Sequence, residues 1–190
     1  MKLPDQRKTN SGFSSSSTDA DGSNASNALW DISRLTTGEL SALRRNAGVM
    51  MSAASMKSQA AFYRAKNLSC NQWQEEFVFP ALCMQSLWRE SDVRKKRLFP
   101  EMLRDIYQDK DATDSMRRKC TEFLDYAWSE DGFLLGKICR LVRRIRTDNP
   151  SVQPDFEAMA IDLSRWNNSN RNIQKKWLRT ICWDGSVPAD

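Results

Sequence analysis

Basic side chains recur on one helical face in the second half of the chain. Lys137, Arg140 and Arg144 are three and four residues apart, so a helix would place them side by side. Ammonium and guanidinium groups at this spacing can bind successive phosphates of a nucleic-acid backbone, and Arg can do so with two parallel hydrogen bonds. Arg143 widens this face. An ordinary solvated face is the alternative, and the spacing alone does not exclude it.

The helix that must position these residues is predicted to run from Ser129 to Arg146. Leu134, Ile138, Leu141 and Ile145 are spaced four, three and four residues apart, one register away from the basic residues. Such a helix has an aliphatic face that must be buried against other helices and a cationic face that must meet water or a polyanion. We therefore expect this helix to lie at the centre of the fold.

Further basic side chains lie on other predicted helices. They are Arg44, Arg45, Arg64, Arg117, Arg118, Lys175, Lys176 and Arg179. Arg117 and Arg118, with Lys119, fall in the first turns of a helix that begins near Asp114, where cations oppose the helix dipole, and this favours a binding role. For Arg44 and Arg45 the spacing alone favours a stabilising interaction with the helix dipole, because they end their helix. The last three residues could line the same groove or face outward.

The composition argues against catalysis. There is no histidine, so the usual general base and the imidazole metal ligand are both absent. The adjacent acidic pairs Glu75-Glu76 and Glu130-Asp131 point to different sides of a helix and cannot hold two metal ions together. The five cysteines have no short zinc-type spacing and are predicted to be buried free thiols. We expect a protein that is not an enzyme and has no metal or cofactor.

The overall charge gives weak support to an anionic partner. There are 29 Lys and Arg against 24 Asp and Glu, a net charge of +5, which matters only if the positive charge is gathered on one surface. No apolar run approaches the length of a membrane span and no signal peptide opens the chain. We expect a soluble, cytoplasmic protein without membrane contact.

Helical periodicity recurs through most of the chain, and no alternating strand pattern stands out. The predicted fold is all-α, a compact helical bundle of two small packed lobes, residues 29–110 and 111–183. Residues 1–28 are rich in Ser and Asn and are predicted to be a disordered leader, and residues 184–190 a frayed tail. Thr36 with Glu39 predicts a capping box. The charged stretch 94–97 is predicted to be a solvated linker.

One aromatic stripe is predicted to face the core. It contains Trp73, Phe77, Ala81, Met84 and Trp88, at helical spacing. Pro80 lies inside this pattern and is predicted to kink or divide the helix.

Several short segments follow one another in a recognisable order and spacing. They are Trp30, Leu35, Gly38, Leu43-Arg44-Arg45, Phe62-Tyr63-Arg64, Leu141-Val142-Arg143-Arg144, Asp155-Phe156, Asp162-Leu163, Trp166 and Gln174 to Trp177. Together, over about residues 29–183, they resemble the CasB family, the small subunit of the type I-E CRISPR surveillance complex Cascade. The chain departs from the family in its long leader, in Phe156 where Trp is frequent, and in residues 92–114.

The resemblance implies a specific role. Proteins of this family are all-helical and non-catalytic, and two copies pack head to tail along the backbone of the complex. They contact the guide RNA and target DNA region mainly without reading bases, and they help to hold the displaced strand of the R-loop in antiviral defence. The partners expected are the backbone and large subunits, a second copy of the chain, and the nucleic-acid strands. The alternative is a helical regulator of transcription that binds duplex DNA, although no helix-turn-helix pair is evident.

Overall fold

A computed structural model describes residues 28–183, so the predicted tail and all of the predicted leader except Ala28 lie outside the described residues. Within this range the chain is mostly helical, which confirms the all-α prediction. The helices are α1 (Thr37–Arg45), α2 (Met56–Ala65), α3 (Gln72–Gln85), α4 (Phe99–Gln108), α5 (Asp114–Glu122), α6 (Phe133–Asp148), α7 (Phe156–Leu163) and α8 (Asn172–Cys182). Two short strands, β1 (Lys95–Arg97) and β2 (Val152–Pro154), complete the fold.

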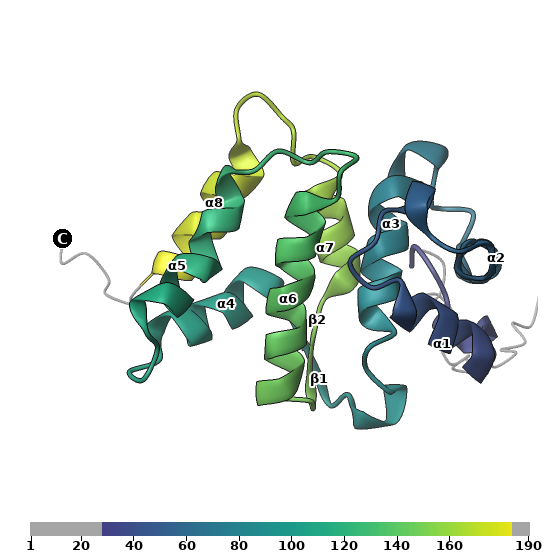
Figure 1. Cartoon of the computed structure of the whole chain (residues 1–190), viewed down its shortest axis with the longest axis horizontal. Helices are drawn as coiled ribbons and strands as arrows, with labels where there is room; N and C mark the ends of the chain where they lie inside the picture. The colour runs from purple at the N-terminus through teal and green to yellow at the C-terminus, as the bar shows by residue number, and fades with distance from the viewer. Residues whose placement is uncertain (1–27, 184–190) are drawn as a thin grey trace, which may run out of the picture.

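The helices are arranged around α6 and α7, which lie in the middle of the molecule (Figure 1). α1, α2 and α3 lie on one side, where α1 packs against α2 and α3 packs against α7. α4, α5 and α8 lie on the other side, with α4 in contact with both α5 and α8. α4 therefore packs with the later helices, although it precedes residue 110. The lobe boundary at residue 110 stays a prediction.

Helix α6 buries the aliphatic face that the sequence predicts. Leu134, Ile138, Leu141 and Ile145 are all buried, which confirms that part of the prediction. The helix begins at Phe133 instead of Ser129, because Gly132 takes a left-handed conformation with φ of 68° just before it.

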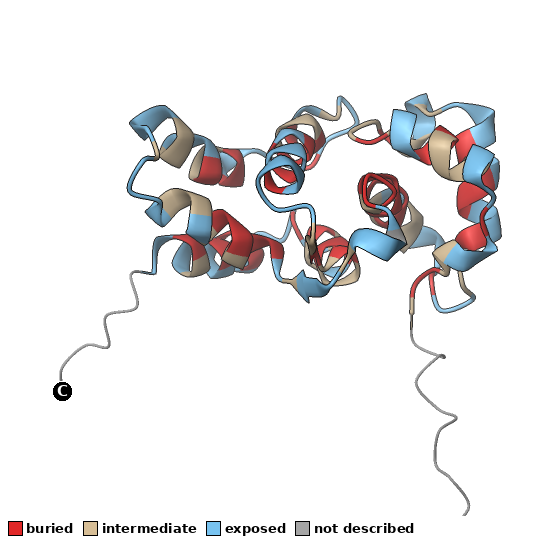
Figure 2. Cartoon of the chain, turned by 90° about the horizontal axis from the view of Figure 1, so that it is seen from below, coloured by how far each residue is buried: buried red, intermediate tan, exposed pale blue. Residues whose placement is uncertain are grey.

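A cluster of large aromatic side chains fills the core between α4, α7 and α8. The Trp166 and Trp177 rings are 5.2 Å apart, and Phe99 lies 5.6 Å from Trp177. Phe123 lies 6.2 Å from both tryptophans. Buried residues line the inward faces of the helices throughout the described chain (Figure 2). This burial supplies most of the driving force for folding.

The predicted aromatic stripe is wrong at its first residue. Trp73 is 88% exposed, although Ala81, Met84 and Trp88 are buried as predicted and Phe77 is half-buried against Trp128. The first turn of α3 projects beyond the core, and periodicity does not show where a helix leaves the core.

Pro80 is buried inside α3 and does not divide it. Proline removes one intrahelical donor, and burial of the residues on both sides holds the helix together.

The stretch 94–97 is not only a linker. Lys95–Arg97 forms β1 and pairs in parallel with β2, and backbone bonds from Arg94 to Ser151 and from Asp155 to Arg97 extend the ladder. The sequence pattern predicts no strands, and the structure corrects this. Three residues are too few to show an alternating pattern, and the pairing partner is far away in the sequence.

The cysteine prediction holds for four of the five residues. Cys70, Cys83, Cys120 and Cys139 are buried free thiols, whereas Cys182 at the end of α8 is exposed. Burial raises the pKa of Cys120 to about 11, so this thiol is protonated at neutral pH.

Candidate nucleic-acid interface

Helices α5 and α6 enclose a groove of about 300 Å³, called here the α5–α6 groove. Lys119 lies on its α5 side, and Lys137, Arg140 and Arg144 lie on its α6 side. The three α6 residues come together because they are three and four residues apart on one helix, as the sequence predicts. The groove thus gathers four cationic side chains from two elements.

The one carboxylate in this groove is already paired. Glu122 accepts a hydrogen bond of 2.8 Å from Lys137 Nζ, and this bond holds the pKa of Glu122 below its usual range. Lys137 also lies over the rings of Tyr126 and Phe133, at 4.9 and 5.1 Å from their centroids. Lys137 is therefore largely engaged within the protein, and the cations that can meet a phosphate are those around it.

Those remaining cations are exposed. Arg140 and Lys119 form no ion pair with any residue between 28 and 183. Arg144 pairs with Asp148 at 2.7 Å, one turn along α6, in an exposed position where such a pair contributes little stability. A phosphate can replace Asp148 at small cost.

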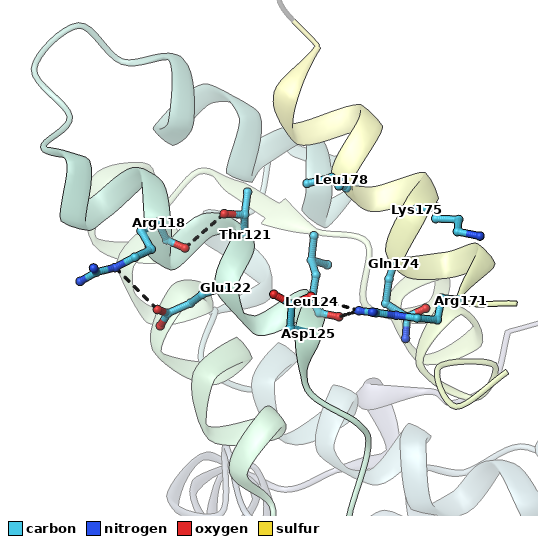
Figure 3. A pocket seen from close by; sticks show the side chains of 9 residues that line it. All are labelled: Arg118, Thr121, Glu122, Leu124, Asp125, Arg171, Gln174, Lys175 and Leu178. Carbon is cyan, nitrogen blue, oxygen red and sulfur yellow. Dashed lines mark hydrogen bonds and ion pairs between the residues drawn. The ribbon is translucent and has the colours of Figure 1, made fainter. Parts of the chain in front are cut away.

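A second hollow lies between α5 and α8, called here the α5–α8 pocket, with a volume of about 570 Å³ (Figure 3). Arg118, Arg171 and Lys175 bring three cationic groups to it. Arg171 Nη2 donates to the Leu124 carbonyl at 2.7 Å and to Asp125 at 3.2 Å, so that guanidinium closes one side of the pocket. Glu122 lines both hollows, which are therefore adjacent.

The predicted basic residues of α8 lie in different surroundings. Lys176 pairs with Asp162 of α7 at 3.2 Å, and Asp162 also accepts a hydrogen bond from the buried Trp177 indole. Lys175 and Arg179 are exposed and form no ion pair within residues 28–183. Lys175 lies at the α5–α8 pocket, so it is the α8 lysine placed for an external anion.

The remaining predicted residues lie outside both hollows. Arg44 donates to the Ser86 carbonyl at 2.9 Å, Arg45 to Ser41, and Arg64 pairs with Glu39 at 3.0 Å. These three belong to α1 and α2, on the other side of α6 (Figure 1).

Arg143 turns away from the α5–α6 groove. Its Nη2 lies 3.4 Å from the Ala47 carbonyl, just after α1. The structure therefore does not bring the predicted set together on one surface.

Arg117 has a structural role in the fold. Its side chain donates to the carbonyls of Tyr107 and Asp109 at 3.1 and 3.2 Å, and so satisfies backbone acceptors at the end of α4. Its neighbour Arg118 is exposed, at the mouth of the α5–α8 pocket, 3.9 Å from Glu122.

Replacing Arg117 with alanine should therefore affect folding more than binding. We expect Arg117→Ala to lower the free energy of unfolding by about 1–2 kcal/mol, because it leaves carbonyls at the end of α4 without their donor. Affinity for single-stranded DNA should change little. Urea denaturation and a binding titration measure both effects, and Arg118→Ala is the matched control. A loss of affinity without a loss of stability would return Arg117 to the interface.

Sequence reasoning missed two residues of the α5–α8 pocket, Arg171 and Gln174. Arg171 precedes α8 in a left-handed conformation with φ of 52°, unusual for a residue other than glycine. Gln174 is an uncharged residue beside Lys175 and Lys176. No periodicity marks either residue, since their place depends on how α8 packs against the segment around Leu124.

Residues 28–183 show neither a candidate metal site nor a candidate membrane span. No group of three or more His, Cys, Asp or Glu residues in this range is placed to hold a metal ion. No helix in the same range has the length and apolar character that crossing a membrane requires.

Comparison with solved structures shows the same fold elsewhere. The crystal structure of M. ruber CasB superposes with a TM-score of 0.59 and 17% sequence identity, over 78% of this chain and 86% of that chain. A chain of a CRISPR RNA-guided surveillance complex gives a TM-score of 0.59 and 19% identity, over 77% and 82%. No curated protein matches the sequence.

The sequence itself gives the family. The family described as CRISPR-associated protein Cse2 matches residues 39–180, well over half of the chain. This match and the structural likeness to CasB confirm the resemblance drawn from the short segments. The chain belongs to the CRISPR-associated protein Cse2 family.

Proposed function

We propose that this chain is a non-catalytic subunit of a CRISPR surveillance complex that binds nucleic-acid backbone without sequence specificity. The observation that carries the proposal is the α5–α6 groove, where Lys119, Arg140 and Arg144 surround a carboxylate that Lys137 has already neutralised. Cations held together on one surface repel one another, and an anion between them relieves that repulsion. A nucleic-acid backbone is a chain of phosphates, and it fits a groove between two helices that are lined with cations.

The strand held in this way is proposed to belong to an R-loop. When a guide RNA pairs with one strand of a DNA duplex, the exchange of one duplex for another is nearly balanced in free energy. The displaced strand re-anneals unless its phosphates are held elsewhere. Backbone contacts of modest strength can therefore decide the outcome, and they act on any sequence.

The assembly follows from the same proposal. The partners are the backbone and large subunits of the complex, a second copy of this chain, the guide RNA and the target DNA, and the location is the cytoplasm. The structural likeness to a chain of a CRISPR RNA-guided surveillance complex supports this arrangement. Arg44, Arg45, Arg64 and Arg143 lie away from the two hollows, on or next to α1 and α2, and are proposed to contact a second segment of nucleic acid.

The direct test is a salt titration with the full chain. Purified protein is mixed with labelled single-stranded and double-stranded DNA of several unrelated sequences, and affinity is measured by fluorescence anisotropy. The three cations of the groove that can meet phosphates, Lys119, Arg140 and Arg144, should contribute a slope of about −2 in a plot of log affinity against log salt. Affinities for the unrelated single strands should agree closely.

Two results would contradict the proposal. Strong preference for one duplex sequence would identify a regulator of transcription instead. Binding that does not respond to salt would show that phosphates are not the contacted groups.

A further inference from the structure

One buried polar atom of α8 has no partner in the fold. Gln174 is 7% exposed, and its Nε2 donates to the Trp166 carbonyl at 2.6 Å. Because only the amide nitrogen can donate to that carbonyl, the orientation of the amide is fixed. Gln174 Oε1 is then left without a hydrogen bond among the described residues. A buried acceptor without a donor lowers the stability of the fold. A ligand that donates a hydrogen bond to this atom would remove that cost.

Gln174 lines the α5–α8 pocket, where its side chain lies among those of Leu124, Asp125 and Arg171 (Figure 3). Leu124 and Leu178 give the pocket apolar sides, and Leu178 is 44% exposed there. Both carboxylates of the lining are paired, Asp125 with Arg171 and Glu122 with Lys137. The pocket therefore has apolar walls, and one unpaired hydrogen-bond acceptor lies buried in its lining.

Cations occupy the mouth of this pocket. Lys175 extends from α8, and Arg118 lies on the opposite side, on α5 (Figure 3). A ligand that satisfies all of these groups has an apolar body, an N–H donor on one edge and an attached anion. A nucleotide has all three, since its base has two apolar faces and N–H groups on its edge, and its phosphate is anionic. The volume of 570 Å³ lies within the range of small-molecule sites, about 300–1,000 Å³.

We infer that the α5–α8 pocket receives one nucleobase of the bound single strand, whose N–H edge donates to Gln174 Oε1. The inference rests on the proposed function, because it takes the strand as already bound. The base packs between Leu124 and Leu178, and its phosphates lie against Lys175 and Arg118. The strand has a continuous path, because a further hollow of about 380 Å³ shares Asp125, Arg171 and Gln174 with this pocket.

The test separates the base from the backbone. Affinity of the full chain is measured for a 12-nucleotide strand of thymidines and for a strand of equal length and charge whose residues are all abasic. Both strands carry the same phosphates, so the difference in affinity reports the bases alone. One base held in an apolar pocket should make the thymidine strand bind about tenfold more tightly.

Two variants locate this difference in the pocket. Leu178→Ala removes an apolar wall without changing charge, and Gln174→Leu removes the acceptor. Each should reduce the ratio of the two affinities towards one and leave the abasic affinity unchanged. Ile161→Ala is the matched control, because Ile161 is 40% exposed on α7 and does not line the pocket. Thermal unfolding of Gln174→Leu checks that loss of the bond to Trp166 has not unfolded the protein.

The possible failures are distinct. If neither strand binds, the proposed function itself fails. If both strands bind with equal affinity, the backbone interface stands and the base pocket is overturned. If the thymidine strand binds more tightly but Leu178→Ala and Ile161→Ala behave alike, the bases contact another part of the surface and the pocket is again overturned. If thymidine monophosphate alone binds as tightly as the strand, the pocket is a receptor for free nucleotides and not for a strand.

Discussion

Replacing Lys119, Arg140 and Arg144 together with alanine should weaken binding of single-stranded DNA by on the order of 100-fold at 0.1 M salt. Each substitution eliminates one phosphate contact. The counterions that this contact would have released then stay on the DNA. Three contacts lower the slope of log affinity against log salt by about two. Arg143 is not part of this variant, because its guanidinium lies against the Ala47 carbonyl. Fluorescence anisotropy across a range of salt concentrations measures both quantities.

The matched control removes the same charge from elsewhere. Arg34, Arg89 and Arg94 are exposed and do not line the α5–α6 groove, so their replacement with alanine changes the net charge equally. This control should lose only a small part of the affinity. Neither variant should change the unfolding midpoint greatly, since the ion pairs of Arg144 and Arg34 are exposed. If the two variants lose equal affinity, the net charge and not the groove binds DNA.

Replacing Trp177 with alanine should lower the free energy of unfolding by about 3–5 kcal/mol. Trp177 is fully buried and contacts the rings of Phe99, Phe123 and Trp166, so its removal leaves a large cavity between α4 and α8. It also leaves Asp162 without the indole donor that lies 2.7 Å away. Urea denaturation monitored by circular dichroism gives the free energy.

Trp73 provides the matched control for the same substitution. It is 88% exposed, so Trp73→Ala should change the free energy of unfolding by no more than about 0.5 kcal/mol. The contrast tests the packing of α8 directly, because the two variants remove identical atoms. Equal losses from both would mean that Trp177 is not in the core.

Much of the fold follows from local patterns in the sequence. The capping box of Thr36 and Glu39 forms as predicted, and Asp155 caps the start of α7 through a bond to the Ala158 backbone. The aliphatic face of α6 is buried because a helical period of apolar residues leaves few alternatives. These features depend on residues a few positions apart, and their physics is contained within one helix.

The candidate site was predictable only in part. Lys137, Arg140 and Arg144 come together because they share a helix, but the contribution of Lys119 and the α5–α8 pocket depend on how α5 packs against α6 and α8. Arg117 and Arg118 show the limit most clearly. They are adjacent cations in one helix, yet one caps α4 and the other faces solvent, and only tertiary packing distinguishes them.

The β1–β2 ladder has a consequence for the order of folding. Its two strands are separated in the sequence by α4, α5 and α6, and parallel pairing requires this whole segment to close as a loop. Closure costs entropy that three residue pairs cannot offset alone, so the ladder should form only after those helices have packed. Once formed, it joins the segment before α4 to the segment after α6. The ladder should therefore be the last contact to close the segment from α4 to α6, after α6 has packed.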